Sequence, residues 1–344
     1  MTENRQSLTL FRATYAANFK EKEFVESTIH QWQNGANYFT LITSGSTGRP
    51  KDIRLYRELL IWSAESTKTA IKSSGNETLI CCLPVTKTGG FMQLVRSLHL
   101  GWQIHFINPQ MSSILEHLEN SSSYNQTSLT PTQLKTILNN NLETLKSFND
   151  ILIGGSPIDK ELEEQLKEIG KMTMTTFYET YGMTETASHV ALRKVGSDNY
   201  FKPQPGVQLS LEDEQLCIAI PRLDFFIKTN DVVKLHPDGF KVLGRSDDVI
   251  NSGGLKIHPM LLEPEIALVL KESGIERPFY ITSQKNKEYG QQAVLVMKGP
   301  PVKNKPHLLE ILKRALPAYH NPKNIIFVDA IEYTDTGKIK RLTL

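Results

Sequence analysis

The sequence predicts an α/β protein with a large N-terminal domain, built on mostly parallel β-sheet, and a smaller α+β domain at the C-terminus. Between residues 78 and 178, strand-like runs alternate with helix-like runs, which is typical of parallel strands covered by helices. Further along, short strands separated by turns indicate an antiparallel β subdomain at about 193–245. The glycine- and charge-rich segment 244–248 favours a boundary between a first domain, 1–245, and a second, 246–344.

Within the first domain, apolar periodicity and turn residues define the expected elements. Apolar runs bounded by turns predict strands at 78–83, 103–107, 150–153 and 174–178. Apolar residues at helical spacing predict helices at 16–33, 55–73, 91–100, 114–119, 131–139 and 158–169. Ser74-Gly75 would end the second of these helices, and Thr130-Pro131, a hydroxyl cap followed by proline, would begin the fifth.

The remaining elements are shorter. In the subdomain, strands are expected at 216–220, 232–235 and 240–243. The second domain is expected to hold a hairpin through Gly253 and Gly254, helices at 259–270 and 306–316, and strands at 279–282, 293–297 and 325–328. This mixture of elements predicts a compact α+β unit.

Composition excludes several classes of protein. The 344 residues, 39% hydrophobic and 22% charged, suffice for a large core. A net charge of +2 lacks the positive footprint of a nucleic-acid binder, and no stretch approaches the ~20 apolar residues that span a bilayer. Cys81, Cys82 and Cys217 lie in apolar strand-like runs, which favours reduced, buried thiols. We therefore expect a cytoplasmic protein without membrane insertion.

The segment 43–51 is the most informative loop. It follows the apolar run 38–42 and holds two glycines, four hydroxyl residues and two cations, a composition suited to binding polyphosphate. It is not a Walker A loop, because Arg-Pro separates the second glycine from the lysine. On its own, a Gly/Ser-rich segment of this kind is more often a hydrophilic connection between strands.

Four further motifs follow this loop in order: Tyr-Gly-Met-Thr-Glu at 181–185, Thr-Asn-Asp at 229–231, Gly-Arg-Ser-Asp-Asp at 244–248 and Thr-Gly-Lys-Ile-Lys-Arg at 336–341. Together the five segments resemble the motif set of the acyl-adenylate-forming superfamily, which includes acyl-CoA and aryl-CoA synthetases, adenylation domains of peptide synthetases and firefly-type luciferases. The resemblance covers about 38–341, and five ordered motifs are far more specific than one. It implies ATP and Mg²⁺ as cofactors, coenzyme A as co-substrate, and a small mobile C-terminal domain.

The resemblance assigns nucleotide binding to a dispersed set of residues. The residues that would bind ATP or AMP are Ser44, Gly45, Ser46, Thr47, Gly48, Lys51, Gly154, Gly155, Ser156, Tyr181, Gly182, Asp231 and Arg245. Within this set, the residues at 154–156 would form the adenine turn and Tyr181 would stack on the base. Asp231 would accept from the ribose hydroxyls. On sequence alone, Tyr181 could equally be a core tyrosine and Asp231 a turn residue.

The resemblance also implies the catalytic residues. Thr184 would bond the α-phosphate, and Glu185 would ligate Mg²⁺, a cation that favours carboxylate and phosphate oxygens. Lys338 would neutralise the charge that develops when a substrate carboxylate attacks the α-phosphorus. Without the other motifs, Lys338 would be read as a solvated C-terminal lysine.

A second half-reaction, transfer of the acyl group to the thiol of coenzyme A, would need a different arrangement. The resemblance implies that the small domain rotates about Asp247 and brings the hairpin with Gly253, Gly254 and Lys256 to the active site. The two glycines would leave room for the pantetheine arm. The alternative is a loop that happens to contain two glycines.

The acid is indicated by the segment 84–90, which reads Pro-Val-Thr-Lys-Thr-Gly-Gly where the family pattern is Pro-Leu-Phe-His-x-x-Gly. Lys87 therefore replaces the gate histidine, and Gly89 and Gly90 complete the segment. Arg96 lies six residues further on, and this spacing resembles the o-succinylbenzoate–CoA ligases of menaquinone biosynthesis, whose aromatic keto-diacid substrate has a second carboxylate. The alternative places Arg96 on the exposed face of an amphipathic helix.

The segment from Tyr181 to His189 also resembles that subfamily, and His189 is included among the acid-binding residues. Only 42 residues precede the phosphate loop, so part of the usual N-terminal subdomain is expected to be missing. An enzyme that loads a carrier protein with an amino or aryl acid is disfavoured, because 84–90 holds no aspartate for an α-amine. A non-catalytic nucleotide-binding protein and a homodimeric state stay open.

Overall fold

The computed structural model describes residues 11–43, 51–119, 124–333 and 339–342. The chain forms two compact units. The first comprises residues 1–208 and 220–225, and the second comprises 209–219 and 226–344. The expected domain boundary after residue 245 lies within the second unit and stays a prediction.

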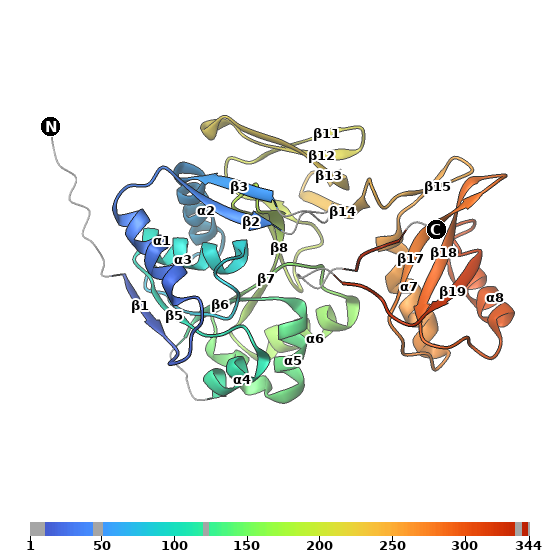
Figure 1. The fold of residues 1–344 in the computed structure, drawn as a ribbon, viewed down its shortest axis with the longest axis horizontal. Coiled ribbons are helices and arrows are strands. Elements are labelled where there is room, and N and C mark those ends of the chain that lie inside the picture. The colour runs from blue at the N-terminus through green and yellow to red at the C-terminus, as the bar shows by residue number, and fades with distance from the viewer. Residues whose placement is uncertain (1–10, 44–50, 120–123, 334–338, 343–344) are drawn as a thin grey trace. The chain divides into compact units, whose positions relative to one another are not determined.

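The first unit is built on an eight-stranded sheet (Figure 1). In spatial order its strands are β1 (Arg12–Tyr15), β5 (Gln103–Phe106), β4 (Thr78–Cys81), β6 (Gln126–Leu129), β7 (Asp150–Ile153), β8 (Thr176–Met183), β9 (Ser188–Lys194) and β10 (Lys202–Pro203). Neighbouring strands are parallel from β1 through to β8, and the pairs β8–β9 and β9–β10 are antiparallel. The predicted α/β class, with a mostly parallel sheet, is confirmed for this unit.

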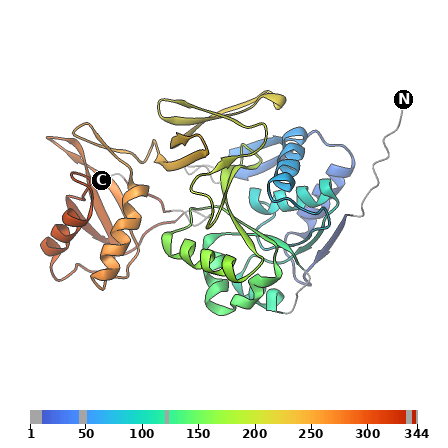
Figure 2. The ribbon, with the colours of Figure 1, turned by 180° about the vertical axis from the view of Figure 1, so that it is seen from behind.

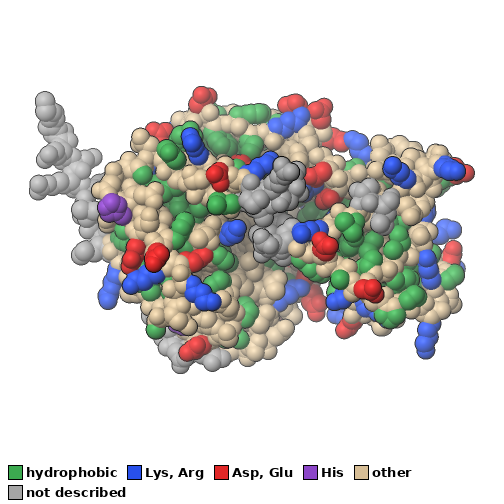
Figure 3. Space-filling model, viewed as in Figure 1, with side chains coloured by type: hydrophobic (Ala, Val, Ile, Leu, Met, Phe, Trp, Pro, Cys, Tyr) green, Lys and Arg blue, Asp and Glu red, His purple; other side chains and the backbone are tan. Residues whose placement is uncertain are grey.

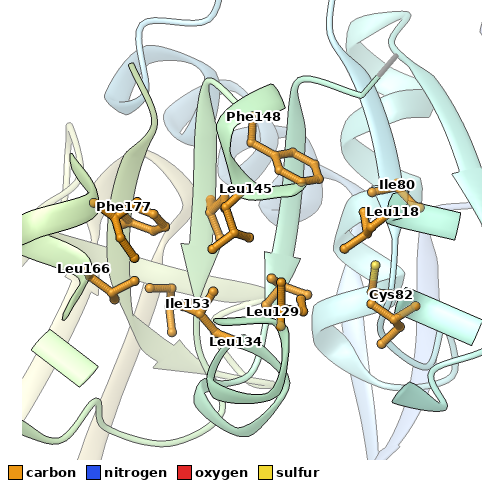
Figure 4. Close-up of a cluster of buried hydrophobic side chains, with 14 of the residues drawn as sticks. Ile80, Cys82, Leu118, Leu129, Leu134, Leu145, Phe148, Ile153, Leu166 and Phe177 are labelled. Carbon is orange, nitrogen blue, oxygen red and sulfur yellow. The ribbon is translucent and has the colours of Figure 1, made fainter. Parts of the chain in front are cut away.

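Helices cover both faces of this sheet. They are α1 (Lys22–Gln33), α2 (Arg57–Ala70), α3 (Thr88–Leu100), α4 (Met111–Glu119), α5 (Pro131–Asn140) and α6 (Lys160–Met172), with a short 3₁₀ helix at Leu142–Ser147. Figure 4 shows the core on one face, where Leu118 of α4, Leu134 of α5 and Leu166 of α6 join Ile80 and Ile153 of the strands. Alternate strand residues point to the opposite face and meet α1 and α3.

Local signals explain where two of these helices begin. Thr130 caps α5 in a capping box with Gln133, and proline occupies the first turn, as the Thr-Pro pair predicts. The side chain of Asp159 caps α6 by accepting from Leu162 N at 2.9 Å. Both helix entries lie just beyond strands of the parallel sheet.

Several strands were missed from the sequence, three of them within the first 130 residues. The first helix begins at Lys22 and not near residue 16, because residues 16–21 form the turns that follow the edge strand β1. The second begins at Arg57, because residues 51–56 form β3 (Lys51–Tyr56), which pairs antiparallel with β2 (Tyr38–Thr43). The third missed strand, β6, has a polar sequence, and Thr127 satisfies its buried hydroxyl by donating to Ile80 O at 2.8 Å.

The second unit begins with a four-stranded sheet. Its strands, in order, are β11 (Gln208–Glu212), β12 (Gln215–Ile220), β13 (Phe225–His236) and β14 (Gly239–Arg245), and a 3₁₀ turn lies at Pro221–Leu223. β13 and β14 pair antiparallel. The sheet starts at Gln208 and not near residue 193, because residues 188–194 and 202–203 extend the large sheet of the first unit.

The rest of the second unit is an α+β layer, seen from behind in Figure 2. Its elements are β15 (Ile250–Ser252), β16 (Leu255–Ile257), α7 (Pro259–Glu272), β17 (Phe279–Asn286), β18 (Gly290–Lys298), α8 (Lys305–Ala315) and β19 (Asn324–Val328). The strand order is β16-β15-β18-β17, and β19 pairs parallel with β18. The hairpin, two helices and three strands predicted here are all present.

The visible surface carries charges of both signs, with Lys and Arg interspersed among Asp and Glu (Figure 3). This distribution agrees with the small net charge of +2. Among the described residues, no helix is both long and apolar enough to cross a bilayer.

Candidate active site

Two elements of the first unit bring together the residues predicted for acid recognition. Thr88, at the start of α3, hydrogen-bonds Thr184 in the connection between β8 and β9, with their Oγ1 atoms 2.7 Å apart. Two turns further along α3, the guanidinium of Arg96 donates to Ser188 Oγ at 3.1 Å. Helix α3 therefore lies against the Tyr-Gly-Met-Thr-Glu motif.

The β8–β9 connection is fixed by its own residues. A Cβ on Gly182 would lie 2.0 Å from Ser188 O, so only glycine allows this close approach of the two strands. The hydroxyl of Thr186 bonds the backbone of Met183 and Ser188 at 2.6–3.0 Å. These contacts hold the motif residues that follow Gly182 in one turn.

The 84–90 segment packs tightly against the start of α3. Lys87 N donates to Pro84 O at 3.1 Å, and Phe91 N donates to Lys87 O at 2.9 Å as the helix begins. A Cβ on Gly90 would lie 2.3 Å from Pro84 O, whereas one on Gly89 would meet only the end of the Leu83 side chain. Lys87 is therefore held at the N-terminus of the helix.

Arg96 is buried, with 3% of its surface exposed, which excludes the alternative of an exposed helix face. Burial lowers the pKa of its guanidinium to about 10, so it stays charged at neutral pH. Its Nε has no hydrogen-bond partner, and no carboxylate pairs with it among the described residues.

His189 lies beside Arg96 and is also buried. Its ring nitrogens lie 3.1 Å from Thr67 Oγ1 and from Ser188 Oγ. Burial and the charge of Arg96 lower the pKa of His189 well below its ordinary value. The imidazole is therefore neutral, and Arg96 supplies the positive charge of this cluster.

The predicted adenine turn follows β7. Gly154 N donates to Leu129 O at 3.1 Å, and Gly155 has a φ of 92°, a conformation that favours glycine. A Cβ on Gly154 would lie 2.4 Å from Thr180 Oγ1 of β8, and Ser156 follows on the same turn. One residue past Thr180, the ring of Tyr181 packs 5.8 Å from that of Phe201. The turn and Tyr181 thus lie on neighbouring strands.

Glu185 is the residue predicted to hold Mg²⁺. Its side chain is exposed, and none of the described residues forms an ion pair or hydrogen bond with its carboxylate. Such a carboxylate fits a hard cation whose other ligands are phosphate oxygens and water. No group of three or more metal-binding side chains occurs within the described ranges.

In the second unit, the predicted ribose and hinge residues are linked. Asp231 and Arg245 face each other across β13 and β14, with Oδ1 and Nη1 3.5 Å apart. Arg245 also binds both carboxylate oxygens of Asp247, at 2.9 and 2.8 Å. The hydrogen bonds that Arg245 donates to Asp247 raise the pKa of Arg245.

The predicted CoA-binding hairpin joins β15 and β16. Gly253 and Gly254 have φ values of 59° and 86°, and Gly253 N donates to Tyr289 O at 2.9 Å. A Cβ on Gly254 would meet nothing within 4 Å, so the tip of the turn is open. Lys256 lies on β16 and forms an ion pair with Glu214.

Some predicted residues fall outside the described ranges. They are Ser44, Gly45, Ser46, Thr47, Gly48 and Lys338. Lys51 is described, as the exposed first residue of β3. The roles of all these residues stay predictions.

Sequence reasoning missed the hydroxyl residues Thr67, Thr88 and Ser188, which surround the predicted acid-binding residues. Ser188 adjoins His189 and Thr88 adjoins Gly89, so their positions next to predicted site residues could have identified these two hydroxyl residues. No signal pointed to Thr67, because its contact with His189 joins residues 122 positions apart.

Comparison with known proteins defines the class. A family model described as AMP-binding enzyme matches residues 5–219. The chain is 31% identical to an acyl-CoA synthetase (AMP-forming)/AMP-acid ligase II-like protein from Dyadobacter fermentans, covering 92% of this chain and 91% of that one, with a TM-score of 0.60. The chain therefore belongs to the AMP-binding enzyme family of the adenylate-forming superfamily, as an AMP-forming acid–CoA ligase family member.

Two relatives indicate more particular similarities. A 2-succinylbenzoate–CoA ligase from Listeria monocytogenes is 26% identical, over 94% of this chain and 72% of its own length. The o-succinylbenzoate CoA synthetase from Bacillus subtilis, solved with its acyl-adenylate intermediate, shares the fold with a TM-score of 0.74 at 23% identity, covering 87% of this chain and 67% of that chain.

Proposed function

We propose that this chain is an ATP-dependent ligase that joins o-succinylbenzoate to coenzyme A in menaquinone biosynthesis. The reaction proceeds through an acyl-AMP intermediate and yields o-succinylbenzoyl-CoA, AMP and pyrophosphate. The similarity to 2-succinylbenzoate–CoA ligases over most of the chain supports this substrate. The observation that carries the proposal is the buried, unpaired charge of Arg96.

An unpaired buried charge costs several kcal/mol, so a protein keeps one where a ligand of opposite charge completes it. Arg96 offers its unpartnered Nε, and Ser188 already holds its Nη2. An acid with a second carboxylate would place that group against the guanidinium in a two-point contact. o-Succinylbenzoate has a ring carboxylate for this purpose, while its succinyl carboxylate reacts.

The remaining acid-binding residues would form the walls of the same pocket. Gly90 lets the segment before α3 approach the helix closely, Gly89 lies beside it, and His189 supplies a neutral ring beside Arg96. Lys87, at the helix start, stands in for the family's gate histidine and is a second cation for the acid.

In the first half-reaction, the loop residues 44–48 with Lys51 would bind the β- and γ-phosphates of ATP. Thr184 would bond the α-phosphate, and Lys338 would neutralise the charge that develops there. Glu185 would hold Mg²⁺, which when bound neutralises phosphate charge. The turn at 154–156 and Tyr181 would bind adenine.

Asp231 and Arg245 would bind the ribose. In the second half-reaction, rotation about Asp247 would withdraw Lys338 and place Gly253, Gly254 and Lys256 near the adenylate. The thiol of coenzyme A would then attack the acyl carbonyl, and AMP would leave.

The test is ATP–pyrophosphate exchange over a panel of aromatic and aliphatic acids, followed by thioester detection with and without coenzyme A. We expect o-succinylbenzoate to give the highest kcat/KM and a CoA-dependent thioester. Equal use of monoacids would contradict the substrate and favour another aryl- or acyl-CoA ligase. Adenylation without thioester formation would indicate a carrier-protein acceptor. If none of the acids supports ATP–pyrophosphate exchange, the chain is a non-catalytic nucleotide-binding protein.

A further inference from the structure

Two carboxylates, Glu21 and Glu179, bind backbone N–H groups of the segments that follow β4 and β7. We propose that each is a positioning residue, Glu21 for the acid-binding segment 84–90 and Glu179 for the adenine turn at 154–156. The inference rests on the proposed function for the assignment of these two segments. Neither carboxylate contacts the substrates in this scheme, and the two act separately.

Glu179 lies on β8 and is only 6% exposed. Its Oε1 accepts from Ile158 N at 3.0 Å, just beyond the adenine turn. The register of the parallel strands sets Glu179 opposite Ile153, the last residue of β7 before that turn. The carboxylate therefore holds the far end of a turn whose near end is fixed by the strand.

Thr180, the next residue of β8, also contacts this turn. Thr180 Oγ1 donates to Ile153 O at 3.0 Å and leaves no room for a side chain at Gly154. Because Tyr181 follows directly, the turn and the predicted stacking ring are placed by consecutive residues of one strand. A shift of the turn would change its spacing from Tyr181, on which the predicted stacking of adenine depends.

The other oxygen of Glu179 is fixed by Arg193 of β9. Arg193 Nε donates to Glu179 Oε2 at 2.9 Å, and both Nη atoms bond Glu163 of α6 at 3.0 and 3.1 Å. Burial acts to lower the pKa of Arg193, but these carboxylates raise it, so the cluster stays charged. Glu179 consequently cannot rotate away from Ile158 without breaking a buried ion pair.

Glu21 has the corresponding place at the acid-binding segment. It lies at the N-terminus of α1, and its Oε2 accepts from Val85 N at 2.6 Å while its Oε1 accepts from Thr86 Oγ1 at 2.7 Å. Lys87 follows at once and forms the turn with Pro84 that packs on Gly90. Glu21 thus fixes the segment immediately before the predicted gate position.

Steady-state kinetics of Glu179→Ala and Glu21→Ala test the two roles, and each variant is the control for the other. Loss of a hydrogen bond to a charged acceptor usually changes an equilibrium by about tenfold or more. Glu179→Ala should raise the KM for ATP by about that factor and leave the KM for the acid near wild type. Glu21→Ala should raise the KM for the acid by about the same factor and leave the KM for ATP near wild type.

The glutamine variants separate positioning from general structure. Glu179→Gln keeps an acceptor for Ile158 N, and Glu21→Gln keeps one for Val85 N while its amide can donate to Thr86. Glu179→Gln should bring the KM for ATP most of the way back to the wild-type value, and Glu21→Gln should do the same for the KM of the acid. Glu179→Gln also weakens the pairing with Arg193 and should lower the Tm. Failure of glutamine to restore KM, or equal increases in both KM values, would overturn the proposal.

Binding of ATP without acid, followed with a fluorescent analogue, distinguishes this inference from the proposed function. If wild type activates an acid other than o-succinylbenzoate, the substrate proposal fails, and that acid serves to test Glu21. If it activates none, the adenylation role and the role of Glu21 fail together. Unchanged ATP binding by Glu179→Ala would overturn the role of Glu179 in either case.

Discussion

At the scale of single residues, burial decides what Arg96 and His189 can do. Both side chains are nearly inaccessible, yet only Arg96 is charged, because its pKa stays well above neutral after burial, whereas burial and the charge of Arg96 hold the pKa of His189 well below its ordinary 6.5. The cluster of Arg96 and His189 therefore offers one permanent cation and one neutral ring. This combination favours an acid with one charge to bury besides the reacting carboxylate.

Arg96→Ala should lower kcat/KM for o-succinylbenzoate by ~10²-fold, in line with ~2–5 kcal/mol for a broken buried charge pair. The KM for ATP should be nearly unchanged. An analogue without the ring carboxylate is the control, since the variant should use it no worse than wild type does. If both acids lose equally, Arg96 has a structural role.

A further residue whose pKa is shifted is Asp150, at the start of β7. Burial and the nearby charge of Glu77 raise its pKa from the ordinary 3.8 to about 6, and Lys194 opposes this. Between about pH 4 and pH 6, the carboxyl of Asp150 is therefore protonated in the native state and ionised in the unfolded state. The stability that Asp150 contributes is present below about pH 4 and is lost as the pH rises through about 6.

Asp150→Asn should consequently stabilise the protein at pH 8 and have little effect near pH 4. The full pKa difference would correspond to ~3 kcal/mol, and solvent around this half-buried carboxyl reduces the gain to about 1 kcal/mol. Urea unfolding of wild type and variant at both pH values measures it. An equal difference at the two pH values would exclude titration of Asp150 as the cause.

At the scale of elements, the start of α3 provides a matched pair of adjacent glycines. Gly90→Ala places a Cβ against the backbone of Pro84 and should cost about 3 kcal/mol of unfolding free energy. Gly89→Ala meets only the flexible end of Leu83, and alanine favours a helix by up to ~1 kcal/mol, so its net effect should be small. Urea denaturation compares the two, and equal losses would argue against the close packing at Gly90.

The elements that sequence predicted well are those whose own residues determine them. Helix α5 carries its capping box and proline, and the apolar strand at 150–153 was placed without error. The strand β6 was missed because Gln126 and Thr127 are polar, and the burial of Thr127 is made acceptable by its hydrogen bond to the neighbouring strand β4. Strand β1 was not predicted, because it is a short edge strand whose side chains are exposed or only partly buried, so it shows little apolar pattern.

At the scale of the whole molecule, the site was predictable as a set of motifs but not as a set of contacts. The order of five motifs identified the superfamily, and the family comparison confirmed it. The contacts of Arg96 with Ser188 and of Glu21 with Val85 depend on which strands are neighbours in the sheet. Strand order is set by tertiary packing, which short-range sequence patterns do not encode.

The proposed rotation between half-reactions is also a property of the whole molecule. Asp247→Pro should leave adenylate formation near the wild-type rate and strongly slow thioester formation, because proline fixes φ at the hinge. Asp247→Ala is the control, since it also removes the contacts with Arg245 but leaves the backbone free. Separate assays of the two half-reactions, with Tm recorded, measure the effects. Equal losses in both steps would argue against a hinge at this residue.

Because all three native cysteines are buried, dyes can be attached selectively to introduced cysteines in order to follow the proposed rotation. Burial raises the pKa of Cys82 to about 12 and that of Cys81 further, so neither supplies thiolate at neutral pH, and Cys217 is only 2% exposed. Maleimide dyes should therefore leave the native chain unlabelled. Cysteines introduced at the exposed Met174, in the first unit, and Tyr319, in the second, would accept a donor and an acceptor dye. Single-molecule energy transfer could then follow the two units through successive turnovers without prior removal of any native thiol.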